Sequence, residues 1–261
     1  LHLCDRRQRQ MCIRDSLKLP YIILLDEANL SPMEYYWSDF MNICDDLGPH
    51  SKVNLGEDYV FGVPETLHFV ATINNDHTTE TLSPRLIDRA WIITLPQLNL
   101  RDYSSLGNES NIPAEEVEVI SWKSLRDAFT PVKDECFFTP ELQKCYESIV
   151  AKLREKKFTV SPRIDIAIKR YWAIASKYFE MDDTKTVAPT IALDYAIAQR
   201  ILPKIGGNGE EFEKWLKEFS SLCSSNGLNT SAAIVKDIIE RGNQQMKYCL
   251  LYTSDAADDR I

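Results

Sequence analysis

A short apolar run that ends in two adjacent carboxylates limits the fold of this chain more than any other feature. The run reaches from Leu19 to Leu25 and is followed at once by Asp26 and Glu27. Its isoleucines and leucines, without a charged interruption, are typical of a strand buried in a sheet. Carboxylates at the end of such a strand can hold a hydrated Mg²⁺ ion and orient a water molecule. The alternative is a solvated acidic pair that only ends a strand.

Further strands and helices follow in alternation. Buried strands are expected over 66–73 and 90–95, and a hairpin or extended loop over 53–63. A helix is expected from Ser31 to about Leu47, with Ser31 as its N-cap and Glu34 completing a capping box. A short helix is expected to begin at Ser83-Pro84. This alternation predicts an α/β fold, with a parallel sheet flanked by helices.

After a turn-rich connector, the apolar periodicity is helical only. Helices are expected to begin at Thr139, Ser161 and Pro189, with two more over 210–222 and 231–241. The apolar stripes expected for the first three helices are Leu142, Tyr146, Ile149 and Leu153; Ile164, Ile168, Tyr171, Ala175 and Tyr178; and Ile191, Tyr195, Ala198 and Leu202. One stripe per helix predicts a small all-α bundle. The glycine cluster at 206–209 is interpreted as a linker.

The two ends of the chain differ from the rest. The pieces MCIRDS and LYTSDAADD resemble translated sequencing-adapter strings, so residues 1–16 and 249–261 are expected to be non-native tails. Between them we expect the C-terminal part of an α/β core over 17–100, a connector over 101–134 and a helical lid over 135–248.

A second polar site follows the strand expected over 66–73. The sequence FVATINND places Asn74 directly after that strand, with Asn75 as the second choice. Because an amide can donate to a phosphate and accept from water, Asn74 is suited to a site beside the two carboxylates. The alternative is a strand that runs into an ordinary Asn/Asp turn. His77, which follows, is interpreted as an ordinary loop histidine.

Arginines stand at two further positions. Arg85 and Arg89 lie on or just after the short helix at Ser83-Pro84, where the alternative is a surface ion pair with Asp88. Arg163 lies in the first turn of the helix that begins at Ser161. A cation there is unfavourable for the helix dipole by ~0.3–1 kcal/mol, which favours a functional reason over an ordinary surface arginine.

The motifs together resemble the AAA+ ATPases, and within them the McrB-like and MoxR-like branch. Asp26-Glu27-Ala28-Asn29 follows the pattern of that branch, whereas Leu30 stands where MoxR-like proteins often have Arg. The stretch LSPMEYYWSDFMNICDD is most similar to McrB-like ATPases. The resemblance covers 20–96 well and 139–206 moderately.

The resemblance implies a role for each candidate residue. Asp26 would bind Mg²⁺ through water and so contact the nucleotide, while Glu27 would polarise the attacking water. Asn74 would be sensor 1, beside the water or the γ-phosphate. The arginine finger, which reaches the nucleotide of the neighbouring subunit, would be Arg89, with Arg85 nearly as good a match. In the helical lid, sensor 2 would be Arg163, which binds nucleotide.

A phosphate-binding loop of the form G-x-x-x-x-G-K-[S/T] is not found in the chain, because none of the nine glycines is followed by Lys. We therefore expect a partial P-loop AAA+ core, whose loop lies upstream. By itself the chain is expected neither to bind nor to hydrolyse ATP or GTP usefully. As the full-length protein we expect an AAA+ NTPase, assembled as a homo-oligomeric, hexameric ring.

Three functions are weighed for that ring. The favoured one is an McrB-like motor that drives a McrC-like nuclease, which handles the DNA. The second is a MoxR-like protein-remodelling ATPase. The third is a non-catalytic interaction module, which the presence of both Asp26 and Glu27 argues against. The hairpin over 53–63 is a candidate pore element, with Lys52 as the nearby cation. The basic stretch 152–157 is interpreted as a solvated helix face rather than a nucleic-acid contact.

Composition limits the partners and the cellular location that we expect for the chain. A net charge of −9 argues against broad, unassisted binding to nucleic acid. The longest apolar runs are much shorter than the ~20 residues of a membrane helix, so no membrane partner is expected. The seven cysteines show no metal-ligand spacing, which predicts reduced thiols and a cytoplasmic location.

Overall fold

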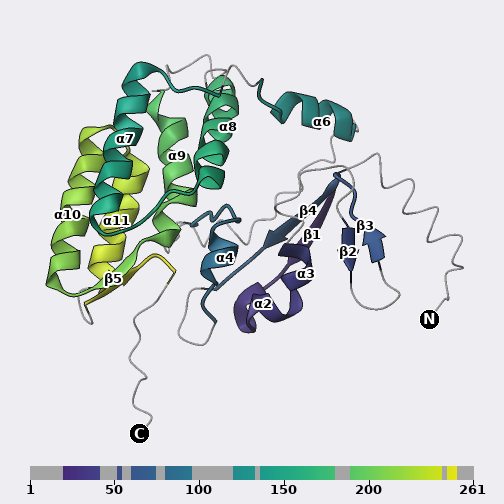
Figure 1. The fold of residues 1–261 in the computed structure, drawn as a ribbon, viewed down its shortest axis with the longest axis horizontal. Coiled ribbons are helices and arrows are strands. Elements are labelled where there is room, and N and C mark those ends of the chain that lie inside the picture. Colours follow the sequence, from purple (N-terminus) through teal and green to yellow (C-terminus); the bar gives the residue numbers. More distant parts are fainter. Residues whose placement is uncertain are drawn as a thin grey trace, which may run out of the picture.

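The computed structural model describes residues 20–41, 52–54, 60–74, 80–95, 120–132, 136–179, 189–242 and 246–251. In this part of the chain a bundle of long helices lies beside a smaller unit that contains two short sheets (Figure 1). In the described residues, short strands and short helices therefore precede the long helices. Among the described residues, no helix has both the length and the apolar character needed to cross a membrane.

The first sheet of the smaller unit pairs the two strands that the sequence predicts first. Strand β1 (Tyr21–Leu25) runs parallel to β4 (Leu67–Ala71), with Tyr21 opposite Leu67 and Leu25 opposite Ala71. The expectation that these strands are buried is wrong. Ile22 is 68% and Leu24 59% exposed. Parallel sheets are normally covered on both faces, and within the described residues one face of this pair is open.

The other face of β1 and β4 packs on two short helices, α2 (Met33–Tyr36) and α3 (Ser38–Met41). The single helix expected from Ser31 is wrong in two respects. The N-cap is Pro32, and no side chain caps the helix, so the Ser31–Glu34 capping box does not form. The helix also breaks at Trp37, whose ring packs edge-on against Phe69 at 5.4 Å. Residues 42–47 of the expected helix lie outside the described part.

The hairpin expected over 53–63 is confirmed. Strands β2 (Lys52–Asn54) and β3 (Val60–Gly62) are antiparallel, with Lys52 opposite Gly62. Val53, the middle residue of β2, is almost fully buried. The turn that joins the two strands lies outside the described residues.

The segment after residue 80 connects the smaller unit to the helices. Helix α4 (Pro84–Ile87) begins as expected, because the Ser83 hydroxyl accepts from the Leu86 amide at 3.3 Å. The third strand expected over 90–95 is wrong. Among the described residues this segment pairs with no strand, and its Ile92 amide donates instead to the carbonyl of Gln199 at 3.2 Å. An apolar run of this length is compatible either with a strand or with an extended segment that packs on helices. Here a helix of the bundle provides the hydrogen-bond partner.

The helical region begins with one short helix and continues as a bundle (Figure 1). The bounds of its helices are α6 (Trp122–Phe129), α7 (Pro140–Glu155), α8 (Pro162–Phe179), α9 (Thr190–Arg200), the 3-10 helix η3 (Leu202–Lys204), α10 (Glu210–Ser225) and α11 (Asn229–Gly242). The Thr139 hydroxyl caps α7 through the Leu142 amide at 3.4 Å. All four residues of the stripe expected on α7 are buried.

Helix α9 lies at the centre of the bundle and differs from the prediction. It packs on α8 and α11, and its buried residues are spread around it: Ala192, Leu193, Asp194, Ala196, Ile197, Ala198 and Arg200. Tyr195 of the expected stripe is exposed. A helix with apolar residues all round fits a central position, so its single-stripe assignment is wrong. On α8, Tyr178 is likewise exposed and stacks on Phe129 at 5.1 Å.

The glycine cluster is a strand rather than a linker. Strand β5 (Gly206–Asn208) pairs antiparallel with β6 (Lys247–Cys249). A side chain at Gly207 would place its Cβ 2.6 Å from the ring of Phe212, so only glycine fits without a shift. Packing also continues past residue 248, the expected end of the lid, because Leu250 is buried.

Candidate functional site

The candidate site lies at the edge where β1 and β4 both end. Strand β1 leads directly to Asp26 and Glu27, and β4 leads to Thr72 and Asn74. Because the strands are parallel and in register, their carboxyl ends meet. The structure therefore brings Asp26, Glu27 and Asn74 together, as the sequence predicts. All three side chains are exposed.

Thr72 connects the two strand ends. Its hydroxyl donates to Asp26 Oδ1 at 2.6 Å and accepts from the Glu27 amide at 2.8 Å. Its own amide donates to the Leu25 carbonyl, and its carbonyl accepts from the Ala28 amide, both at 2.9 Å. One residue thus contacts each of the four residues from Leu25 to Ala28.

Glu27 has an unusual backbone conformation. Its φ of 48° and ψ of 45° lie in the left-handed region, which costs a non-glycine residue roughly 1–2 kcal/mol. The Asn74 side chain donates to Glu27 Oε1 at 3.4 Å, a long contact. The turn at Glu27 is therefore supported by β4 through both Thr72 and Asn74.

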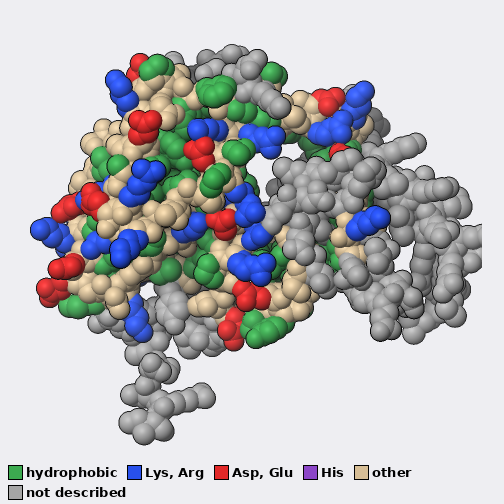
Figure 2. All heavy atoms as spheres, in the orientation of Figure 1, with side chains coloured by type: hydrophobic (Ala, Val, Ile, Leu, Met, Phe, Trp, Pro, Cys, Tyr) green, Lys and Arg blue, Asp and Glu red, His purple; other side chains and the backbone are tan. Residues whose placement is uncertain are grey.

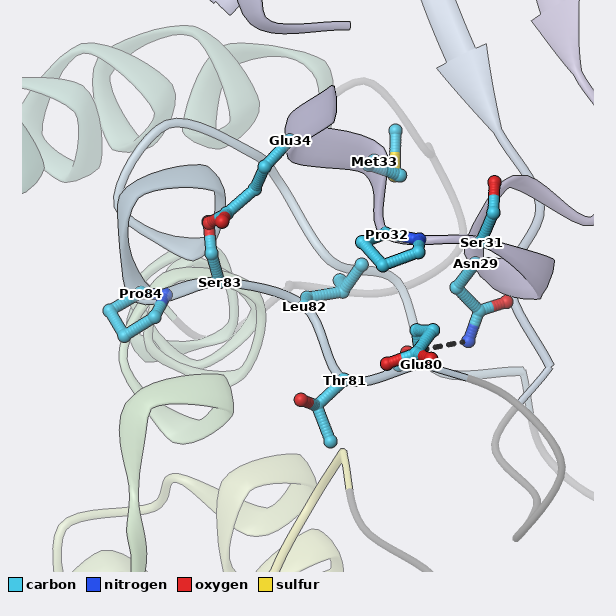
Figure 3. A pocket seen from close by; sticks show the side chains of 10 residues that line it. All are labelled: Asn29, Ser31, Pro32, Met33, Glu34, Glu80, Thr81, Leu82, Ser83 and Pro84. Atoms are coloured by element: carbon cyan, nitrogen blue, oxygen red, sulfur yellow. Dashed lines mark hydrogen bonds between the residues drawn. The ribbon is translucent and has the colours of Figure 1, made fainter. Parts of the chain in front are cut away.

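The side chain of Asn29 forms two hydrogen bonds with the Asn74 backbone. Asn29 is only 4% exposed, and its side-chain amide donates to the Asn74 carbonyl at 2.7 Å while its Oδ1 accepts from the Asn74 amide at 3.1 Å. Asn29 also meets Glu80. Its side chain donates to the Glu80 carbonyl at 3.3 Å, and its own carbonyl accepts from the Glu80 amide at 2.8 Å (Figure 3). A single buried amide therefore joins the site to the segment that leads into α4.

A cavity of about 260 Å³ lies beside this junction. It is formed between residues 29–34 and 80–84, with the carboxylates of Glu34 and Glu80 and the hydroxyls of Ser31, Thr81 and Ser83 in its lining (Figure 3). Asp26 and Glu27 do not line it. The cavity is a neighbour of the candidate site rather than part of it.

Arg85 lies on α4 and Arg89 lies two residues after its end, and the contact shown for them joins them to each other rather than to Asp26 or Glu27. Arg89 donates to the Arg85 carbonyl at 2.9 Å, and Arg85 is exposed. The alternative ion pair of Asp88 with one of these arginines is wrong. Asp88 accepts instead from Arg163 at 2.9 Å and from Lys204 at 2.8 Å, two cations of the helical region.

Asp88 therefore joins α4 to the start of α8 and to η3. Partial burial would raise the pKa of its carboxyl, but Lys204 and Arg163 together outweigh this and hold that pKa below its ordinary value. The backbone of the same segment is held by Arg200, which is 2% exposed and donates to the carbonyls of Asp88 and Ala90. The guanidinium of Arg200 also lies over the Trp91 ring, 5.1 Å from its centre. Arg163 thus lies at the junction between the two units.

The donor set at the sheet edge suits a hydrated hard cation. Asp26 and Glu27 are exposed residues with carboxylate oxygens, and Mg²⁺ prefers oxygen ligands while keeping several of its waters. Among the described residues, no group of three or more His, Cys, Asp or Glu side chains converges. The residues therefore fit Mg²⁺ held mainly through water.

The basic stretch expected on a helix face is partly neutralised. Lys152 is bound to Glu155 at 2.7 Å and to Glu218 at 2.8 Å. Figure 2 shows basic and acidic side chains interspersed over the visible face of the helical region. This arrangement favours the interpretation of 152–157 as a solvated face.

Several contacts were not anticipated from the sequence. Thr72 had a signal, since it is a polar residue at the end of an apolar strand, two positions before Asn74. Asn29 appeared only within the motif, and nothing in the sequence shows that it is buried. The partners of Asp88 are 73 to 116 positions away, a distance that local patterns do not bridge. Asn75 and His77 lie outside the described residues.

Comparison with known proteins places one part of the chain in a family. Neither the curated proteins nor the solved structures gave a match. Residues 116–248 match a family model described as a domain of unknown function, DUF8727. The match includes Arg163 and the helical region but not the sheet edge with Asp26, Glu27 and Asn74. Because the match covers more than half of the chain, the chain belongs to the DUF8727 family.

Proposed function

We propose that the sheet edge at Asp26 and Glu27 is the hydrolytic part of an AAA+ nucleoside-triphosphatase. The observation that carries this proposal is the meeting of Asp26, Glu27 and Asn74 at the carboxyl ends of two parallel strands. Ligand sites in open α/β sheets lie outside the carboxyl ends of strands. Two carboxylates and an amide at that place suit metal-assisted attack of water on a phosphate.

Each side chain has a separate task in this proposal. Asp26 holds Mg²⁺ through bound water, and the ion supplies charge neutralisation for the phosphates of ATP or GTP. Glu27 accepts a hydrogen bond from the attacking water and polarises it. Asn74 orients that water or the γ-phosphate, because its amide both donates and accepts.

The open face of the sheet supports an incomplete core. Ile22 and Leu24 are exposed on a parallel sheet, although parallel strands normally lie under cover on both faces. We propose that further strands and helices, including the phosphate-binding loop, lie upstream in the full-length protein. The chain by itself is then expected to be inactive towards nucleotides.

The arginines complete the proposed active ring. Arg85 is exposed on α4, where it or Arg89 would act on the nucleotide of a neighbouring subunit. Arg163 lies at the junction of core and lid, where a sensor 2 residue would reach phosphate. The proposed assembly is a cytoplasmic hexamer of the McrB-like kind, with a McrC-like nuclease and its DNA as partners.

The test is hydrolysis by the protein extended upstream through the phosphate-binding loop. We expect Glu27→Gln to lower kcat for ATP or GTP about 10²–10⁴-fold, because the attacking water loses its base, while nucleotide binding is kept. The matched control is Glu34→Gln, a nearby exposed carboxylate on α2, which should leave kcat unchanged. Equal turnover by the Glu27→Gln and unaltered proteins would contradict the proposal.

A further inference from the structure

We propose that Thr72 is a positioning residue whose hydroxyl group sets the carboxylate of Asp26 and the backbone of Glu27. This inference rests on the proposed function, in which Asp26 and Glu27 carry the chemistry. Thr72 directly follows the neighbouring strand β4 and is not part of the Asp26-Glu27 motif. It would act on the reaction only through Asp26 and Glu27.

The hydroxyl of Thr72 makes two hydrogen bonds of opposite direction. It donates to Asp26 Oδ1 at 2.6 Å, within the short range of bonds between a hydroxyl and a carboxylate. It accepts from the Glu27 amide at 2.8 Å. A hydroxyl has only one proton to donate, so giving it to Asp26 leaves the oxygen to accept from Glu27. One atom therefore fixes the carboxylate of the first residue and the backbone of the second.

The first bond keeps Asp26 suited to a hydrated cation. A donor on Oδ1 fixes the rotation of the carboxylate about its Cβ–Cγ bond. The Thr72 bond engages Oδ1 only, and the second oxygen keeps a defined direction. Without the hydroxyl, the carboxylate would be free to rotate, and Mg²⁺ would be held less well.

The second bond supports the strained turn at Glu27. The left-handed conformation at φ 48° is unfavourable for glutamate, so the turn needs support from its surroundings. The amide of Glu27 bonds to the Thr72 side chain and the amide of Ala28 to the Thr72 carbonyl. Only the first of these bonds depends on the hydroxyl, so a substitution of the side chain can separate them.

The chain offers a matched control just before the same strand begins. Thr66 is 3% exposed, and its hydroxyl has no hydrogen-bond partner in the described structure. Its carbonyl accepts from the Tyr21 amide, a bond that a side-chain change leaves in place. Thr66→Val therefore makes the same chemical change as Thr72→Val but leaves the hydrogen bonds of the site intact.

The first experiment uses the chain itself and needs no nucleotide. Amide hydrogen exchange is measured by NMR for Thr72→Val, Thr72→Ser and Thr66→Val. We expect the Glu27 amide to exchange about tenfold faster in Thr72→Val, because its acceptor is gone, and at the original rate in the other two variants. An unchanged rate for the Glu27 amide in Thr72→Val would overturn the inference.

The second experiment uses the protein extended upstream through the phosphate-binding loop. We expect Thr72→Val to lower kcat about tenfold or more and to raise the Mg²⁺ concentration for half-maximal rate, with KM for nucleotide changed less than about threefold. Thr72→Ser should restore both, since it keeps the hydroxyl, and Thr66→Val should match the unaltered protein.

The two experiments separate failure of the inference from failure of the proposed function. If the extended protein turns over nucleotide and Thr72→Val matches it, the positioning role is wrong and the proposed function stands. If unaltered and Glu27→Gln proteins are equally inactive, the proposed function fails. In that case the exchange rate of the Glu27 amide still decides whether Thr72 holds the turn.

Discussion

Asp88 shows at the scale of a residue how the two units are joined. Its carboxylate binds Arg163 and Lys204, and the Ser161 hydroxyl donates to the same carboxylate at 3.3 Å. All three partners belong to the helical region, whereas Asp88 ends α4. A carboxylate with two cationic partners is stabilised in its ionised form, in agreement with its lowered pKa.

The lowered pKa of Asp88 predicts a pH-dependent contribution to stability. A carboxyl whose pKa falls on folding stabilises the fold above its ordinary value of 3.8, and this contribution is lost as the pH falls through the folded value. At pH 7 we expect Asp88→Asn to lower the free energy of unfolding by about 1–3 kcal/mol. The difference from the unaltered protein should shrink below pH 3.8, as measured by urea unfolding.

The control for Asp88 is Asp127→Asn, which removes an exposed carboxylate whose only described ion pair is with Arg126 at 3.7 Å. Such a surface pair contributes little, so this variant should stay within about 0.5 kcal/mol of the unaltered protein. A pH-independent effect of Asp88→Asn would show that the carboxylate acts through packing rather than charge.

Helix starts are the feature that the sequence predicts best at the scale of an element. Ser83 and Thr139 cap their helices as expected, because a hydroxyl before proline is a local signal. The capping box at Ser31 fails, since the helix starts one residue later, after Pro32, whose side chain has no hydrogen-bond acceptor. Local signals therefore predict a helix start correctly only where tertiary contacts do not shift it along the sequence.

Helix α11 begins on a carboxylate that no local pattern reveals. Asp194 of α9 is buried and accepts from the amides of Thr230 and Ser231 at 2.7 and 2.8 Å. These amides lie in the first turn of α11, where no earlier carbonyl in the helix can accept from them. A side chain from another helix thus takes the place of an N-cap.

We expect Asp194→Ala to lower the free energy of unfolding by about 2–4 kcal/mol, because one buried and one partly buried amide lose their carboxylate acceptor. Asp194→Asn retains one oxygen and should lower it by about half as much. Helical content during urea unfolding, followed by circular dichroism, measures both. A change in Asp194→Ala below about 0.5 kcal/mol would mean that water or another group replaces the carboxylate.

The buried face of each helix was predicted less well than its range in the sequence. On α7 the expected stripe is the buried one, because that helix packs on one side. On α9 burial extends around the helix, and the segment at 90–95 donates a hydrogen bond from Ile92 to α9 instead of joining a sheet. In both cases the deciding contact comes from elements distant in sequence, which periodicity does not encode.

At the scale of the whole molecule, the two units differ in how much of their apolar surface is covered. Leu193 is fully buried in the bundle, whereas Leu24 on the sheet is 59% exposed. The site residues stand on the less covered unit. The sequence predicts the site because Asp26, Glu27 and Asn74 follow apolar strands, but the open face became visible only in three dimensions.

This contrast predicts that Leu24→Ala destabilises the protein by different amounts in two settings. In the present chain we expect Leu24→Ala to cost less than about 1 kcal/mol, and Leu193→Ala to cost about 2–5 kcal/mol. In the protein extended upstream, Leu24→Ala should also cost about 2–5 kcal/mol, because the proposed additional layers would cover that face. Thermal or urea unfolding of each variant, compared with its unaltered parent protein, measures these differences in the free energy of unfolding. Equal, small costs for Leu24→Ala in both settings would contradict an incomplete core.

The most direct test of the hydrolytic site is a structure of the extended protein with Mg²⁺ and a non-hydrolysable nucleoside triphosphate. We predict that the metal-bound waters contact Asp26 and that a water near the γ-phosphate lies within about 3 Å of the Glu27 carboxylate. Asn74 should contact that water or the phosphate. A nucleotide bound elsewhere, with Asp26 and Glu27 facing only solvent, would contradict the account.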